Sequence, residues 1–169
     1  MGNKYFIVVD MQNDFCTGSL KNDNAVKIIP NIVTKIKELK AKGYKIIATR
    51  DTHHNNYLKT KEGKNLPVEH CLENSKGWQV VSEISPLIDE FIDKSNFCYL
   101  KWGEVLKEPE IVEICGVVTS ICVASNAICI SATFPETEVI VHSSLTADIT
   151  EENYKSALNT MKAQQITIA

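Results

Sequence analysis

Short, nearly continuous apolar runs recur along this chain of 169 residues, and longer segments separate them. The six runs lie at residues 4–10, 43–51, 90–94, 110–117, 137–142 and 165–168. Strands that are apolar on both sides are typical of parallel sheets, which helices cover on both faces. Because helical patterns alternate with these runs, we predict an α/β fold, with a doubly wound, mostly parallel open sheet and helices on both faces.

Two of the separating segments have helical spacing. In the first, apolar residues follow one another at steps of three or four, at Val26, Ile29, Val33, Ile36 and Leu39. Gly43 closes this helix, and Pro30 is expected in its first turn or at a kink. The second helix has Thr150 as its N-cap. Its apolar residues are Tyr154, Leu158 and Met161.

The bulk composition narrows the functions open to the chain. Its length suits a single domain, residues 1–169. Apolar residues make up 44% and charged residues 23%, and no apolar run approaches the roughly 18 residues of a membrane span, so we expect no membrane role. The net charge of −3 comes without a basic stripe, which argues against binding nucleic acid. The N-terminus lacks a secretory signal, so we expect a cytoplasmic protein with reduced thiols.

Charged residues end three of the predicted strands, at Asp10, Asp51 and Lys94. Cys122 lies just past a fourth strand, where a helix begins. In an open parallel sheet, ligands bind outside the carboxyl ends of the strands. We therefore expect these side chains, far apart in the sequence, to meet in one crevice. Lys101 competes with Lys94 for the lysine position on sequence grounds alone.

Cys122 has two interpretations. Near the start of a helix, unpaired N–H groups and the helix dipole favour the thiolate, which would make Cys122 a nucleophile aided by a base or a cation. Cysteine is also a common small core residue, which is our interpretation of Cys115 and Cys129. Asp10 is likewise either a base or the cap of a turn. Position alone does not separate these alternatives.

Residues 52–85 show little periodicity, which predicts a functional loop or lid. Asp51 and His53 precede or open this segment, and His70 lies within it. Two imidazoles and one carboxylate leave positions open for water or substrate, as catalytic metal sites do. The alternative is a polar loop with solvent-facing histidines, which is our interpretation of His54.

Four motifs carry a resemblance to a known family. They are "VVDMQNDF", "DTH" with the later "EHC", "IDKSNF" and "GVVTSICV". In this order they resemble the isochorismatase-like cysteine hydrolases, whose best-known members are nicotinamidases. The resemblance extends from Tyr5 to the C-terminus and implies a doubly wound α/β fold, in agreement with the periodicity.

The resemblance implies a catalytic role for each of three residues. It makes Asp10 the base and Cys122 the nucleophile. It also favours Lys94 over Lys101 as the catalytic lysine. It also implies a cis peptide between Val117 and Val118. The N–H groups of Val118 and Cys122 would then form an oxyanion hole.

A metal site and a substrate pocket are implied as well. The metal ligands would be Asp51, His53 and His70. They would hold a divalent ion, zinc first, with iron or manganese also open. Phe15 matches a pocket aromatic of the family, whereas Leu66 stands where many nicotinamidases place a large aromatic. The implied partner is a small amide substrate, with nicotinamide as the best candidate and another small amide or a ureido compound as the alternative. The resemblance leaves the oligomeric state undecided, and a homo-oligomer is one alternative.

A phosphoreceiver signalling domain with a Mg²⁺ site is the alternative from another class. Asp10, Asp51 and Lys94 at strand ends would suit it. Two features argue against it: Asp10 and Asp14 are not adjacent, and Asp51 closes the second predicted strand instead of the third. This alternative also leaves the histidines and Cys122 without a role.

Overall fold

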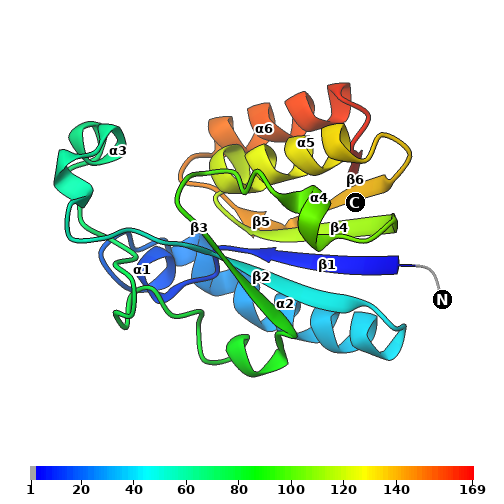
Figure 1. The fold of residues 1–169 in the computed structure, drawn as a ribbon, viewed down its shortest axis with the longest axis horizontal. Helices are drawn as coiled ribbons and strands as arrows, with labels where there is room; N and C mark the ends of the chain where they lie inside the picture. The colour runs from blue at the N-terminus through cyan, green and yellow to red at the C-terminus, as the bar shows by residue number, and fades with distance from the viewer. Residues whose placement is uncertain (1–2) are drawn as a thin grey trace.

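The computed structural model describes residues 3–169 and contains one open sheet of six strands, flanked by helices (Figure 1). The strands are β1 (Asn3–Val9), β2 (Lys45–Asp51), β3 (Glu90–Lys94), β4 (Pro109–Val117), β5 (Glu138–Ala147) and β6 (Thr167–Ile168). Neighbouring strands all pair in parallel, in the order β3-β2-β1-β4-β5-β6. The predicted parallel sheet is confirmed, and each predicted apolar run overlaps one strand, although β5 continues five residues past its run.

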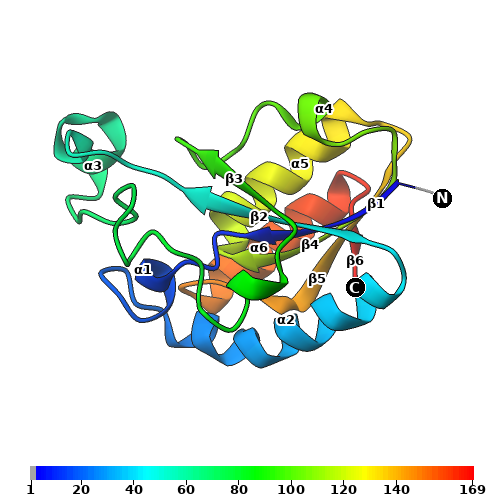
Figure 2. The same cartoon turned by 60° about the horizontal axis from the view of Figure 1, so that its bottom comes forward.

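Helices cover both faces of this sheet, also as predicted (Figures 1 and 2). The α-helices of the described residues are α1 (Asn13–Cys16), α2 (Asp23–Ala41), α3 (Lys61–Asn65), α4 (Trp102–Val105), α5 (Ala124–Thr133) and α6 (Glu151–Ala163). The apolar side of α2 packs in one core cluster, and α5 and α6 pack in the other, across the sheet. Within residues 3–169, no helix combines the length and the apolar character needed to cross a membrane.

Helix α2 differs in detail from its predicted pattern. Its buried residues are Ala25, Ile29, Ile32, Ile36 and Leu39. Val26 belongs to the predicted helical series but is 37% exposed, so it lies outside this buried side. The helix begins at Asp23, so Pro30 lies inside it and not in its first turn. The helix starts earlier because Asn22 caps it, with a side chain that accepts a hydrogen bond from Asn24 N.

The N-cap predicted for the last long helix is confirmed. Thr150 accepts a hydrogen bond from Asn153 N at the start of α6. Residues 52–85 are mainly irregular, as expected, but they contain α3 and one short 3₁₀ turn, Tyr57–Lys59, and a second 3₁₀ turn begins at Ser85. Figure 1 shows α3 beyond the carboxyl ends of the strands, at the same end of the molecule as α1. The irregular segment thus borders the edge where a ligand would bind.

The strand order places a crevice between β1 and β4. Chain connections lead away from this point in opposite directions, toward β3 on one side and β6 on the other. Ligands of open α/β sheets bind at such a switch point. The two strands pair in register, with Val9 opposite Gly116. Gly116 has φ +114°, and a Cβ there would lie 2.1 Å from Val9 O, so only glycine fits.

Candidate active site

Asp10, Lys94 and Cys122 meet at the carboxyl edge of the sheet, as the sequence predicts. Asp10 directly follows β1, Lys94 is the last residue of β3, and Cys122 lies in a π-helical turn, Thr119–Val123, between β4 and α5. Lys94 Nζ lies 2.7 Å from Asp10 Oδ2 and 3.6 Å from Cys122 Sγ. It also donates a hydrogen bond of 3.0 Å to Asn96 O. The buried ammonium therefore has both groups within reach.

The charges of Asp10 and Lys94 support one another. Burial lowers the pKa of Lys94, but its neighbours, first Asp10 and also Asp51, raise it by more than burial lowers it. The pKa of Lys94 therefore lies above the usual range, and the ammonium stays charged. Burial raises the pKa of Asp10, and Lys94 only partly offsets this. Thr49 Oγ1 donates a hydrogen bond of 2.7 Å to Asp10 Oδ1, which fixes the carboxylate. A carboxylate with a raised pKa is a better base than an exposed one.

Burial dominates the state of Cys122. It raises the pKa of the thiol well above the usual value, Asp10 raises it further, and Lys94 lowers it in part. The expectation that the helix start favours a thiolate is therefore outweighed by desolvation. A base therefore has to remove the thiol proton when the sulfur reacts. Asp10 is the carboxylate that lies beside the Lys94 ammonium and the Cys122 thiol.

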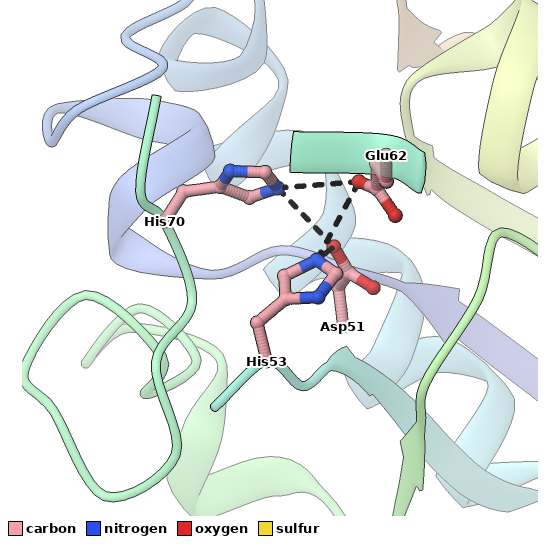
Figure 3. A group of neighbouring side chains, drawn as sticks. All are labelled: Asp51, His53, Glu62 and His70. Atoms are coloured by element: carbon pink, nitrogen blue, oxygen red, sulfur yellow. Dashed lines mark hydrogen bonds and ion pairs between the residues drawn. The ribbon is translucent and has the colours of Figure 1, made fainter. Parts of the chain in front are cut away.

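A second cluster joins the three predicted metal ligands and adds a fourth residue (Figure 3). Its members are Asp51, His53, Glu62 and His70, whose ligand atoms all lie within 4.8 Å of one another. His53 Nε2 lies 2.9 Å from Asp51 Oδ2 and 3.5 Å from Glu62 Oε1. His70 Nε2 lies 3.5 Å and 3.7 Å from the same two oxygens.

These separations fit a bound ion. A tetrahedral ion with ligands at about 2.1 Å keeps them roughly 3.4 Å apart, near the four distances between a histidine and a carboxylate given above. His70 Nδ1 lies 2.8 Å from Val68 O, so it is placed to donate a hydrogen bond and leave Nε2 free as a ligand. Burial raises the pKa of Asp51, but hydrogen bonds from His53 and His70 more than offset this and hold it below the usual range. The carboxylate is ionised, as a metal ligand must be.

Sequence reasoning missed Glu62 and the residues that support the cluster. Glu62 lies in the five-residue helix α3, inside a segment without periodicity, so no pattern marked it. The side-chain amide of Gln12 binds the backbone of Asp51 twice: Nε2 donates to Asp51 O and Oε1 accepts from Asp51 N, each at 2.8 Å. Asp14 Oδ2 accepts from Cys71 N at 2.8 Å, beside His70. Both lie in "MQNDF", which was used only for its resemblance.

A pocket of about 820 Å³ opens above the two clusters. Its lining includes Phe15, Leu66, Phe97, Val118, Cys122 and Ile149. Phe15 and Leu66 therefore lie where the sequence predicts. The predicted cis peptide between Val117 and Val118 is confirmed. Phe97, which is 40% exposed, and the exposed Ile149 form part of the wall that the sequence did not indicate.

The competing residues lie elsewhere. Lys101 precedes α4 and is exposed, 3.9 Å from Glu104. His54 is also exposed, as predicted, and lies 3.4 Å from Glu73. Cys115 is fully buried in β4 and Cys129 is half-buried in α5, in keeping with packing roles.

Comparison with known proteins gives one consistent result. The family model of the Isochorismatase domain matches residues 4–169. A crystal structure of pyrazinamidase of Pyrococcus horikoshii in complex with zinc is 30% identical, covers 99% of this chain and 98% of its own, and has a TM-score of 0.79. The pyrazinamidase/nicotinamidase from Streptococcus mutans is 23% identical, with 99% and 100% covered and a TM-score of 0.86. An isochorismatase family protein from Desulfovibrio vulgaris is 19% identical, with 99% and 94% covered and a TM-score of 0.84. The last two likenesses concern the fold alone.

Proposed function

This chain belongs to the isochorismatase family and is a hydrolase of amide bonds, and on that premise we propose that it cleaves a small carboxamide, best nicotinamide, through a cysteine-bound thioester. The contact of Lys94 with both Asp10 and Cys122 carries this proposal. Cys122 lines the pocket, and this contact puts a candidate base and a buried cation next to its sulfur, which supports the proposal. The family match also excludes the phosphoreceiver alternative.

The chemistry follows from these three groups. Cys122 Sγ attacks the amide carbon while its proton passes to Asp10, which forms a C–S bond and a tetrahedral oxyanion. The N–H groups of Val118 and Cys122 stabilise that oxyanion. When it collapses, the C–N bond breaks, and Asp10 returns the proton to the leaving nitrogen, which departs as ammonia. Lys94 stays charged throughout and holds Asp10 beside the sulfur.

The second half of the cycle uses the same groups. A water molecule attacks the thioester carbonyl, and Asp10 accepts its proton. The C–S bond breaks, Cys122 recovers its proton, and the carboxylic acid leaves. Burial raises the pKa of Asp10, which makes the carboxylate a stronger base, whereas the raised pKa of the Cys122 thiol opposes its deprotonation. Asp10 therefore takes the proton as the sulfur attacks.

The metal cluster supports substrate placement. Asp51, His53, Glu62 and His70 would hold a divalent ion, and zinc in the Pyrococcus horikoshii pyrazinamidase supports zinc here. Such an ion would supply a Lewis acid that orients the substrate, for example through a ring nitrogen. The chain's own residues shape the rest of the pocket. Phe15 offers a ring face near His70, with ring centroids 5.6 Å apart, whereas Leu66 offers only an aliphatic contact.

The proposal is tested by ammonia release from a panel of small amides. The panel contains nicotinamide, pyrazinamide, an aliphatic amide of similar size and a ureido compound, each measured beside a Cys122→Ala blank. We expect release from nicotinamide or pyrazinamide, since both place a ring nitrogen near an amide. Ammonia release from the aliphatic amide or the ureido compound alone would contradict the proposal that nicotinamide is the substrate. Release at equal rates by the blank would contradict the mechanism.

A further inference from the structure

Asn126 is a fully buried polar residue on α5, one helical turn after Cys122, and it makes four hydrogen bonds. Its Nδ2 donates to Cys122 O at 2.7 Å and to Phe97 O at 3.0 Å. Its Oδ1 accepts from Tyr99 N at 3.0 Å and from Trp102 Nε1 at 3.1 Å. An asparagine amide has two donor hydrogens and two acceptor sites, so every one is used.

The partners fix the orientation of this amide. Two carbonyl oxygens face Nδ2 and two N–H groups face Oδ1, so a flipped amide would oppose like with like at all four contacts. Buried polar groups without partners are costly, which makes this arrangement stiff. Asn126 therefore joins the turn that carries the nucleophile to residues 97–99 at two points.

The joined loop also touches the catalytic lysine. Asn96 O, next to Phe97, accepts the hydrogen bond from Lys94 Nζ at 3.0 Å. Lys94 ends an edge strand, two strands away from β1, and its ammonium reaches Asp10. Asn96 O is the backbone partner that helps to fix the ammonium there, beside the carboxylates of Asp10 and Asp51. The loop that supplies this partner is tied to Cys122 by Asn126.

We propose that Asn126 is a positioning residue for catalysis, one that sets the separation of Lys94 and Cys122 by clamping the loop of residues 96–99 to the nucleophile turn. It does not touch the substrate and does not line the pocket. This inference rests on the proposed thioester mechanism for its effect on turnover. Its effect on the reactivity of Cys122 does not depend on the substrate.

Two variants separate the two halves of the clamp. Asn126→Ala removes all four contacts. Asn126→Thr should keep the contact to Cys122 O, because threonine hydroxyls in this protein bond the carbonyl four residues back, as Thr133 does to Cys129 at 2.7 Å. It loses the contacts to Phe97, Tyr99 and Trp102. Trp102→Phe is the matched control, since it removes one hydrogen bond from Asn126 but leaves the loop of residues 96–99 attached.

Four quantities are measured on each folded variant: kcat and KM for the amide that wild type hydrolyses, the rate of Cys122 alkylation by iodoacetamide at neutral pH, and the urea midpoint. We expect Asn126→Thr to lower kcat and the alkylation rate about tenfold or more, with KM changed less than threefold, because small misplacements of reacting groups are costly. Trp102→Phe should lower the urea midpoint yet leave kcat and alkylation near wild type.

Wild-type kcat and alkylation rates in Asn126→Thr would overturn the inference, as would equal losses in Trp102→Phe. Failure of both Asn126 variants to fold would also overturn it, by making the residue purely structural. The alkylation rate distinguishes this test from that of the function. If wild type hydrolyses no amide, the proposed function fails, while the comparison of alkylation rates still decides the role of Asn126.

Discussion

At the scale of single residues, the environment distinguishes Cys122 from the other cysteines. Cys122 is the one that lies against Lys94 and lines the pocket. We expect Cys122→Ala to lower amide hydrolysis by at least about a thousandfold, as loss of a nucleophile does, without changing the urea midpoint by much. Cys129→Ala and Cys115→Ala serve as controls and should keep turnover. Hydrolysis by Cys122→Ala at the wild-type rate would remove the thioester from the mechanism.

The two candidate lysines give a second prediction at this scale. Lys94 is buried beside Asp10 and Cys122, whereas Lys101 is exposed. The charge of Lys94 lowers the pKa of Cys122, so its removal should raise that pKa and the pH at which iodoacetamide reacts. We expect Lys94→Ala to lower kcat about a hundredfold or more. Lys101→Ala should change kcat and the pH of alkylation little. The reverse pattern in the two variants would make Lys101, and not Lys94, the catalytic lysine.

At the scale of elements, periodicity predicted α2 but not all of its buried side. Steps of three and four residues fit either Val26 and Val33 or Ala25 and Ile32 as partners of Ile29, and the sequence assignment took Val26 and Val33. In the structure, Ala25 and Ile32 are the pair that is buried against the sheet. The sequence could not settle this, because the face that a helix buries depends on its rotation against the sheet.

This correction can be measured as stability. Ile32 is fully buried in the α2 cluster, so Ile32→Ala should lower the free energy of unfolding by about 2 to 5 kcal/mol. Val26 faces solvent, and Val26→Ala should cost less than about 1 kcal/mol, since the apolar area lost is small and alanine favours the helix. Urea unfolding of both variants provides the comparison. Equal losses would mean that α2 is rotated from this arrangement.

The segment that contains α3 was predicted only as a loop or lid. Glu62 reaches the metal cluster because Thr60 caps α3, with an N-cap side chain that accepts a hydrogen bond from Gly63 N. We expect Glu62→Gln to lower the affinity for zinc about tenfold or more, because an anionic ligand is lost. Glu69→Gln, an exposed change in the same segment, is the control. Isothermal titration with zinc measures both, and equal affinities would remove Glu62 from the site.

At the scale of the whole molecule, the sequence predicted strands and their common edge but not their order. Apolar runs show which segments are buried, whereas lateral order depends on which strands pair after the chain has crossed the sheet. The convergence of Asp10, Lys94 and Cys122 followed from the rule that ligands bind at the carboxyl edge. The choice of roles came from the resemblance, since the same residues also suited a turn cap, an exposed lysine and a core cysteine. Asn126 carried no pattern at all, because its four partners are brought together only by the packing of α5.

The contact of β1 with β4 gives a prediction for the molecule as a whole. Asp10 follows β1 and the Cys122 turn follows β4, so the spacing of these strands sets the distance between base and nucleophile. Gly116→Ala would place a Cβ 2.1 Å from Val9 O at φ +114°, which forces the strands apart. We expect it to lower the free energy of unfolding by at least about 3 kcal/mol, from strain and overpacking together, and to lower kcat in the fraction that folds. Gly103→Ala is the matched control, because its Cβ would approach only Thr133 Cγ2, at 3.6 Å. Urea unfolding and ammonia release measure the two effects, and a Gly116→Ala protein as stable and active as Gly103→Ala would show that β1 and β4 do not pack this closely.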